Sequence, residues 1–593
     1  MRYVKLLLAG LFIWGAIYIG LKMSQLKLWG YLPLGLFGFS WAAIVCLIPG
    51  FWKSGLQRKA AFLSTVSGLL FYVAFPVVSW TPLIFIAFVP LLFIKDAIEK
   101  SGIRRKFLWH SLYTYHAFMV WNILTTFWVA NTALAPALFA FGLNSLFMLV
   151  PWLGMIRIGR RFPQYSVLSL IVFWMCFEWI HMNWEISWPW LTLGNSWASF
   201  PKLIQWYELT GVFGGSLWIL VLNVLIYKWL LKIDYSRLKY SLPNFKMDHF
   251  KSRLFLVIIS IVVIPMLASY VRFTTYKEKG QRIDVGIVQP NYEPHYEKFM
   301  DSEEIQMVRF EKLTRAAMTP SVEFVIWPET SFGYIRTDEY ATDWRIKHMR
   351  DLLTTFNRGD LIAGVSTVKF YKRDEIPGPA ARSTNDKINP RFYEIQNSAL
   401  QILNDKDSIS IYLKSKLVPG AEIFPFKKIL FFLKPIVHDL GGSVEGLGTQ
   451  SERKVFFNGK YRVAPVICYE SIYGNFIKGF IENGAQAIFI MTNDGWWDNT
   501  PGHIQHLLFG ALRAIEFRKP IARSANTGIS CVIDQKGMIH QATKYNEQAS
   551  FYSPIAVNNY RTVYSYTGDL IAYLSIVATL VLIVFSYYKK LVR

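Results

Sequence analysis

Three residues in the second half of the chain bring together a thiol, a carboxylate and an ammonium group, each beside an apolar β run. Glu329 ends the run EFVIWPE, where partial burial would raise its pKa toward that of a useful general base. Lys414 lies in YLKSKLVPGAEIFP, next to an apolar LVP. Cys468 follows VAPVI at the predicted start of a helix, where N–H groups lower a thiol's pKa and stabilise an oxyanion. This set would suit covalent acyl chemistry.

Each of the three residues also has an ordinary structural explanation when it is taken alone. Glu329 fits a solvated loop carboxylate, and Lys414 fits a basic strand edge. Cys468 fits a buried core thiol or, in an oxidising compartment, one half of a disulfide with Cys531. The four cysteines show no CxxC spacing, so neither a zinc site nor a disulfide scaffold is predicted.

Two further groups of polar residues raise the question of a site and have simpler explanations. His503 and His506 in GHIQH lie three apart on a predicted helix, but no third ligand accompanies them at a recognised spacing, so we predict no metal. Glu178 lies within an apolar stretch, where ionisable groups are functional candidates. Pairing with His181 or with the backbone would also account for it.

The composition indicates a membrane protein with one large polar segment. Of the 593 residues, 53% are hydrophobic and 17% aromatic, and apolar stretches of membrane-spanning length occur before Tyr270 and again after Gly568. The net charge of +23 comes largely from Lys and Arg in short loops rather than from one block, so nucleic acid is not a predicted partner. The run from Leu6 to Gly20 resembles a signal peptide, but without a cleavage site we predict a retained helix.

Ten membrane spans are predicted, and the charges of their loops predict their orientation. The spans are 4–22, 30–50, 60–77, 80–97, 113–131, 136–156, 166–183, 211–232, 254–271 and 569–588. Lys and Arg gather after the even-numbered spans and in the tail Lys589, Lys590 and Arg593, whereas the loops 79–82 and 131–136 have none. This places both termini in the cytoplasm and the polar segment outside. Lys22 and Lys27, in the first outer loop, run against the pattern.

The polar segment 280–555 alternates short apolar β runs with amphipathic helices, which predicts a layered α/β domain. Predicted strands are 283–290, 323–329, 361–367, 397–403, 461–470, 487–494, 520–526 and 530–534. Predicted helices are 302–318, 341–357, 471–483 and 502–518.

Taken together, these features resemble one known family. The order Glu, Lys, Cys in the settings WPE, K-x-x-LVP and CYE resembles the nitrilase superfamily. The stretch TNDGWWDNTPGHIQHLLFGALRAIEFRKPIARSANTGIS at 492–530 is similar to the segment that apolipoprotein N-acyltransferases carry after their cysteine. GLLFYVAFP, FEWI, SWPWLTLGNS and GVFGGSLWILVLN resemble that family's membrane spans. The resemblance covers roughly residues 60 to 590.

The resemblance implies a fold and an activity. The fold is a polytopic α-helical membrane domain plus a nitrilase-like αββα sandwich outside the bacterial inner membrane. The activity is transfer of an acyl chain from a phospholipid, through a cysteine thioester, to the α-amino group of a diacylglyceryl-modified lipoprotein cysteine. No cofactor is implied. The corresponding domains are 1–58, two additional helices; 59–275, the helical bundle; 280–555, the catalytic domain; and 568–593, the last helix and tail.

The resemblance also implies a role for individual residues. Cys468 would be the nucleophile, Glu329 the general base and Lys414 the cation facing the tetrahedral intermediate. The supporting positions are Glu422, Asn397, Tyr469 and Glu470.

Three departures from the family pattern leave particular features open. The tryptophan that the family places after its first domain strand has only Phe299, Tyr292 or Tyr296 as a counterpart here. The family's LVPFGE is LVPGAE, which changes the turn before Glu422. Residues 1–58 have no counterpart in the usual eight-helix pattern.

Two other functions are compatible with parts of the sequence. A membrane-anchored amidase of the same superfamily would use the same three residues, with water as the second nucleophile, but an anchor needs one span rather than ten. A transporter with an accessory outer domain predicts charged residues lining several spans, and these are nearly absent.

Overall fold

The computed structural model describes residues 2–233, 250, 252–298, 300–356, 359–384, 390–404, 408–427, 429, 431–433 and 445–591. Phe299, considered above as a counterpart of the family tryptophan, and Arg593 of the tail lie outside these residues. The chain forms two compact units. One comprises Met1–Val129, Ala137–Thr275 and Asp569–Arg593, and the other comprises Ala130–Pro136 and Tyr276–Gly568.

The first unit is helical, and each predicted span overlaps one of its helices. They are α1 (Arg2–Ser24), α2 (Leu32–Leu47), α3 (Gly55–Ala74), α4 (Val89–Lys100), α5 (Lys106–Thr126), α7 (Asn144–Arg161), α8 (Ser166–Asn183), α9 (Tyr207–Leu230), α11 (Arg253–Thr275) and α18 (Leu570–Leu591). Seven stretches of the described chain are long and apolar enough to cross a membrane. The unit is therefore a multi-pass membrane domain. Of the remaining helices, α2 is short, and polar residues lower the hydropathy of α3 and α5.

Two predicted spans are interrupted in the structure. The span 80–97 consists of a 3₁₀ turn, Thr81–Ile86, followed by α4, and each has a proline in its first turn, where proline is favoured. The span 136–156 contains a π-helical turn, Phe139–Leu143, between α6 (Leu134–Leu138) and α7. A continuous apolar stretch predicts where a membrane helix lies but not where its hydrogen-bonding pattern changes.

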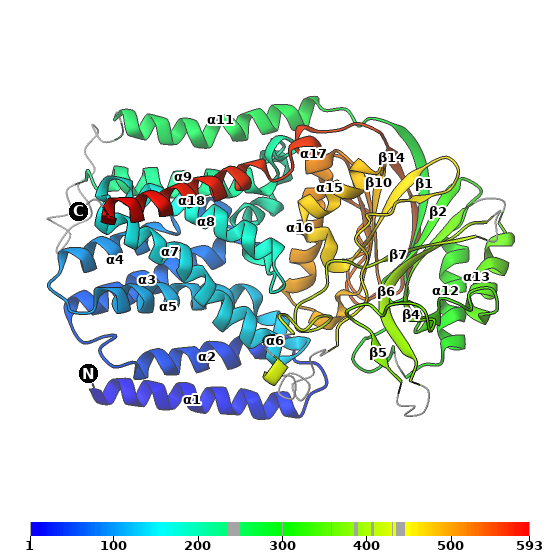
Figure 1. The fold of residues 1–593 in the computed structure, drawn as a ribbon, viewed down its shortest axis with the longest axis horizontal. Coiled ribbons are helices and arrows are strands. Elements are labelled where there is room, and N and C mark those ends of the chain that lie inside the picture. The colour runs from blue at the N-terminus through cyan, green and yellow to red at the C-terminus, as the bar shows by residue number, and fades with distance from the viewer. Residues whose placement is uncertain are drawn as a thin grey trace. The chain divides into compact units, whose positions relative to one another are not determined.

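The buried carboxylate of Glu178 is hydrogen-bonded within the helical unit. Glu178 on α8 accepts hydrogen bonds from the backbone N–H of Leu193 at 2.9 Å and from the Trp174 indole at 3.0 Å. The backbone explanation for this carboxylate is thus confirmed. In the Trp-rich segment after α8, Trp190 and Trp197 are buried within the unit. The last helix, α18, packs against α8 (Figure 1).

The second unit contains two β-sheets. The first has the order β14-β1-β2-β4-β6-β5, with β3 beside β4 and β7 beside β6. Its strands are β1 (Gln281–Gln289), β2 (Val322–Trp327), β3 (Ile335–Arg336), β4 (Asp360–Phe370), β5 (Arg382–Ser383), β6 (Phe392–Ile402), β7 (Ile409–Leu413) and β14 (Ala549–Val557). The second sheet has the order β13-β12-β11-β10-β9-β8. Its strands are β8 (Phe456–Phe457), β9 (Arg462–Ile467), β10 (Ala487–Thr492), β11 (Ile521–Ala525), β12 (Cys531–Ile533) and β13 (Ile539–His540).

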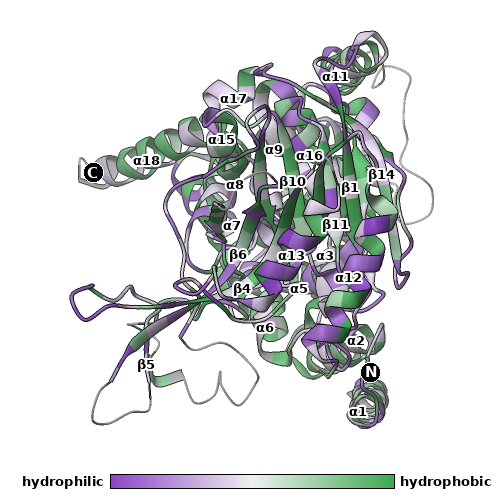
Figure 2. Ribbon diagram, turned by 90° about the vertical axis from the view of Figure 1, so that its right-hand side faces the viewer, coloured by the Kyte–Doolittle hydropathy of each residue, from purple (hydrophilic) through white to green (hydrophobic). Residues whose placement is uncertain are grey.

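The two sheets face each other and helices cover their outer sides. Between the sheets, the Phe324 and Phe489 rings lie 5.4 Å apart, and Ser524 donates to the carbonyl of Val288. Helices α12 (Glu303–Ala317) and α13 (Trp344–Thr354) pack their apolar faces on the first sheet, leaving hydrophilic faces outward (Figure 2). Helices α15 (Gly474–Glu482) and α16 (Pro501–Phe517) accompany the second sheet. The predicted αββα sandwich is confirmed.

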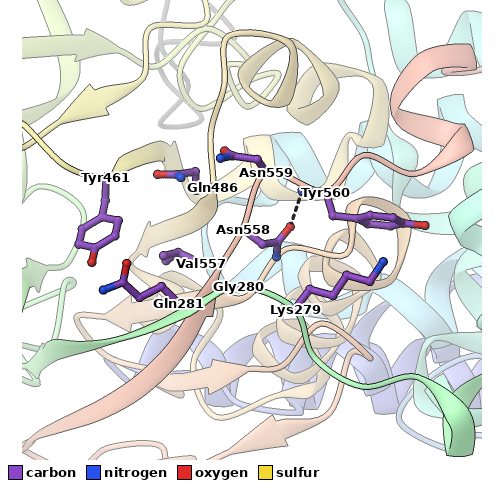
Figure 3. A pocket seen from close by; sticks show the side chains of 9 residues that line it. All are labelled: Lys279, Gly280, Gln281, Tyr461, Gln486, Val557, Asn558, Asn559 and Tyr560. Atoms are coloured by element: carbon purple, nitrogen blue, oxygen red, sulfur yellow. Dashed lines mark hydrogen bonds between the residues drawn. The ribbon is translucent and has the colours of Figure 1, made fainter.

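Six of the observed strands were absent from the sequence prediction: β3, β5, β7, β8, β13 and β14. The longest of them is β14. β14, ASFYSPIAV, lies at the edge of the first sheet and pairs antiparallel with β1 from Gln281↔Val557 to Gln289↔Ala549. A surface hollow of about 400 Å³ lies where β1 begins and β14 ends (Figure 3). It is lined by Lys279, Gly280, Gln281, Tyr461, Gln486, Val557, Asn558, Asn559 and Tyr560, and thus by none of the predicted site residues.

Candidate active site

Cys468 lies at a sharp turn where a buried strand ends. Residues 463–467 of β9 are all buried, and Cys468 opens a 3₁₀ turn, Cys468–Ile472. Its φ of 50° is left-handed, a conformation that costs a residue with a Cβ about 1–2 kcal/mol and persists only where tertiary contacts hold it. One such contact is the hydroxyl of Ser471, which donates to the Cys468 carbonyl at 2.8 Å.

Glu329 lies two residues beyond β2, at the corresponding end of a strand in the other sheet. Its side chain is buried, and Thr330 follows with a left-handed φ of 50°. The loop lies close against β4, since a Cβ at Gly364 would be 2.5 Å from the Pro328 carbonyl oxygen and 2.7 Å from the Glu329 Cα. Glycine at 364 is therefore what permits this close approach.

Lys414 directly follows β7, and its ammonium lies between two carboxylates. Nζ donates to Glu329 Oε1 at 2.9 Å and to Glu422 Oε1 at 2.8 Å. Asn397 on β6 donates from Nδ2 to the same two oxygens, at 2.8 and 3.1 Å. Lys414 is only 1% exposed, so this cluster is shielded from solvent. The structure thus brings together four residues that the sequence places far apart.

The electrostatics of the site keep the carboxylate and the ammonium charged and the thiol neutral. Burial alone would raise the pKa of Glu329, but Lys414, Asn397 and the Cys468 thiol lower it below its usual range. Burial opposes the charge on Lys414, yet the two carboxylates hold its pKa well above the ordinary value. Burial and the negative charge of Glu329 raise the pKa of Cys468, and Lys414 opposes this only in part.

These directions correct two expectations. A raised pKa for Glu329 was wrong, because the ammonium outweighs burial. A lowered pKa for Cys468 was wrong, because only a five-residue 3₁₀ turn follows it and burial dominates. The arrangement instead holds a neutral thiol hydrogen-bonded to an ionised carboxylate. Such a pair can pass the proton as the sulfur attacks an electrophile.

Tyr469 and Glu470, the two residues after the cysteine, make different kinds of contact. Glu470 accepts from the Tyr412 hydroxyl and the Ser415 N–H, both at 2.7 Å, and from the Ile467 N–H at 2.8 Å. It therefore ties the loop that carries Lys414 to the strand that carries Cys468. Burial raises the pKa of Glu470 to about 7 against these bonds. The buried ring of Tyr469 packs edge-on against Tyr473.

With the altered turn LVPGAE, the Glu422 carboxylate still lies in the site. Its second oxygen accepts the backbone N–H of Val418 at 2.9 Å, while the first meets Lys414. Of the three counterparts considered for the family tryptophan, Tyr292 is buried with its ring 3.8 Å from the Arg309 guanidinium, and Tyr296 is exposed.

Cys468 forms no disulfide, and the two histidines of GHIQH belong to no metal site among the described residues. Cys468 and Cys531 are both free, which excludes a disulfide between them in this structure. Among the described residues, no group of three or more His, Cys, Asp and Glu side chains is arranged to hold a metal ion. His506 instead faces Asp494 and the main chain of Cys468.

Sequence reasoning missed Lys298. This buried lysine donates to Thr330 Oγ1 at 2.6 Å and lies 3.4 Å from the Glu329 carbonyl oxygen, so a second ammonium steadies the loop of the carboxylate. Its one available signal was its place in YEKF, beside the position at which the family tryptophan was sought.

Comparison with known proteins extends over both units. Residues 67–225 match the family model described as "Apolipoprotein N-acyltransferase N-terminal domain", and residues 284–562 match "Carbon-nitrogen hydrolase". The "Apolipoprotein N-acyltransferase" of Chlorobaculum tepidum is 27% identical over 532 residues, which cover 87% of this chain and 95% of that protein. The protein of the same description from Geobacter metallireducens is 25% identical over 545 residues, covering 90% and 96%.

Both models occur in the order that places a membrane domain before a nitrilase-like domain, and these relatives align over nearly their whole length. The chain therefore belongs to the apolipoprotein N-acyltransferase family.

Proposed function

We propose that this acyltransferase moves a fatty acyl chain from a phospholipid to the α-amino group of an N-terminal diacylglyceryl-cysteine, through a thioester on Cys468. The observation that carries the proposal is the buried contact of Glu329 with Lys414 and the Cys468 thiol, in a chain that also has a multi-pass membrane unit. Phospholipid and acceptor are both lipids, which accounts for an enzyme domain joined to many spans.

In the first half-reaction, Glu329 takes the thiol proton as Cys468 Sγ attacks the ester carbonyl carbon of the phospholipid. The developing oxyanion is stabilised by the ammonium of Lys414, a charge already fixed in a site with little water. Collapse breaks the acyl C–O bond. The proton on Glu329 passes to the leaving oxygen, so a lysophospholipid departs and a thioester remains.

In the second half-reaction, the α-amine of the acceptor attacks the thioester carbonyl. Glu329 removes a proton from the amine, the C–S bond breaks, and the proton returns to sulfur as an amide forms. An amide is more stable than a thioester, so this half runs downhill. Glu422 and Asn397 hold the ammonium and the base in place throughout.

The proposed location of the catalytic unit is the outer side of a bacterial inner membrane, with both termini in the cytoplasm. The loop charges support it. So does the segment 130–136, from the predicted outer loop after the fifth span. Within the second unit, Asn131 donates to the Trp497 carbonyl at 3.0 Å, and its own carbonyl oxygen lies 3.2 Å from His295 Nε2.

The test is to incubate the purified full chain with phospholipid labelled in its acyl chain and to isolate labelled protein. We expect a hydroxylamine-sensitive label that is lost in Cys468→Ser and retained in Cys531→Ser, whose sulfur is also buried and free. Adding a diacylglyceryl peptide should move the label into a hydroxylamine-resistant amide. Label released only as free fatty acid, with or without the peptide, would instead favour the amidase-like alternative.

A further inference from the structure

His506 lies directly beneath the turn that carries the nucleophile. It comes from α16, is 1% exposed, and its Nε2 is 3.1 Å from the Cys468 carbonyl oxygen and 3.0 Å from Ser471 Oγ. On the other side of the ring, Nδ1 is 2.9 Å from Asp494 Oδ1. None of the catalytic steps above uses this histidine.

The surroundings of His506 indicate that its Nε2 is a donor. A carbonyl oxygen can only accept, so the nitrogen that faces the Cys468 carbonyl carries a proton. Ser471 satisfies the same pattern, because its hydroxyl donates to the Cys468 carbonyl and leaves its lone pairs for Nε2. The Ser471 hydroxyl and the His506 ring thus both donate to this one carbonyl oxygen.

Asp494 faces the other ring nitrogen and is itself firmly held. Its Oδ2 accepts from Arg523 at 2.7 Å and its Oδ1 from the Thr492 hydroxyl at 2.8 Å. Burial would raise the pKa of Asp494, but Arg523 and His506 hold it well below its usual range. Arg523 also lies 3.2 Å from His506 Nδ1, so Asp494 and Arg523 together fix the orientation of the ring.

We propose that His506, oriented by Asp494, is a positioning residue that holds the left-handed turn at Cys468 by donating to its carbonyl oxygen. A cysteine at φ 50° is strained, and this bond is part of what keeps its sulfur aimed at Glu329 and Lys414. The inference rests on the proposed transfer through Cys468, and it accounts for one histidine of GHIQH without a metal.

The experiment compares His506→Ala, which removes the donor, with His506→Gln, whose amide N–H can still reach the carbonyl. His503→Gln is the matched control: His503 lies one turn earlier on α16, is also buried, and packs 4.6 Å from the Tyr545 ring. Two rates are measured on the full chain in detergent: thioester formation from saturating labelled phospholipid, and alkylation of Cys468 by iodoacetamide, which needs no acyl donor. Elution volume and thermal midpoint report folding.

We expect thioester formation to fall roughly 100-fold in His506→Ala, the effect of misplacing a reacting group by about 1 Å, with the half-saturating phospholipid concentration unchanged. His506→Gln should recover to within about tenfold of the unaltered chain and His503→Gln to within about twofold, and alkylation should follow the same order. If His506→Ala does not fold, the rates of His506→Gln, compared with those of His503→Gln and the unaltered chain, test the inference.

Three results would overturn the inference: equal rates in His506→Ala and the unaltered chain, equally low rates in folded His506→Ala and His506→Gln, or a loss in His503→Gln as large as that in His506→Ala. Absence of any thioester in the unaltered chain would count against the proposed function instead, and the alkylation rates would still test the role of His506.

Discussion

Replacing Lys414 by Met removes one charge from the centre of the site while keeping most of the side chain's volume. The ammonium lies 2.9 Å from one carboxylate and 2.8 Å from another. At an effective dielectric constant of about 20, each contact is worth about 6 kcal/mol of Coulomb energy. Desolvation offsets much of this, and removing one partner from a buried ion pair costs about 3–5 kcal/mol of folding free energy. Glu329 and Glu422 would then face each other without a cation.

The stability of Lys414→Met should decrease as the pH rises. In the unaltered chain, the raised pKa of Lys414 and the lowered pKa of Glu329 leave both contributions to stability intact between about pH 5.5 and about pH 8. Without Lys414, burial dominates and raises the pKa of Glu329. Its contribution is then present below its unfolded pKa and is lost as the pH rises through the folded pKa, so Lys414→Met should be less stable at the higher pH.

The assay is thermal unfolding of the detergent-solubilised chain, followed by tryptophan fluorescence at both pH values. We expect the midpoint of Lys414→Met to lie roughly 5–10 °C below that of the unaltered chain near pH 8, and to recover partly near pH 5.5. Lys416→Met is the control, because the Lys416 ammonium lies over the Tyr473 ring, and burial and Arg453 lower its pKa, whereas two carboxylates raise the pKa of Lys414. If Lys414→Met and Lys416→Met shift the midpoint equally at both pH values, the reasoning about paired carboxylates is refuted.

Three further substitutions test other parts of the site. Glu329→Gln should slow thioester formation about 10²–10⁴-fold, the usual contribution of a general base, and a time course of hydroxylamine-sensitive label that matches the unaltered chain would contradict this role. Glu470→Gln places an amide N–H opposite one of the donors that now bond to the carboxylate. We therefore expect the free energy of unfolding, measured in denaturant, to fall by about 1–3 kcal/mol. An unchanged free energy of unfolding would show that Glu470 does not tie the two segments together. Gly364→Ala should displace Glu329 and abolish thioester formation. Gly333→Ala is its control, since a Cβ there meets only the end of the Glu303 side chain.

The positions of the three proposed catalytic residues could be predicted because each lies beside an apolar run and the three together resemble the nitrilase pattern. Polar residues that interrupt such runs mark the ends of buried strands, where neighbouring side chains converge. The ion-pair network itself could not be predicted. The Lys414 ammonium contacts both Glu329 and Glu422, and at Glu329 burial, which raises the pKa, is outweighed mainly by the charge of this ammonium. Both facts depend on the path of the loop 414–422.

Other features left little trace in the sequence. β14 contains a proline and alternates polar with apolar residues only loosely, which is tolerated at a sheet edge but weakens the signal of a strand. The role of His506 depends on Asp494, Arg523 and the Cys468 carbonyl, and local spacing reveals only the pair of histidines in GHIQH.

Because β1 and β14 are antiparallel neighbours, the polypeptide begins and finishes the sandwich at a single point on its rim. A module whose two ends are adjacent can be spliced into a loop of a host protein without stretching either partner. A membrane protein could thus acquire a soluble hydrolase domain as one insertion. A short linker from residue 558 to residue 280 would join the two ends of the sandwich, so that new termini could be placed in another loop by circular permutation.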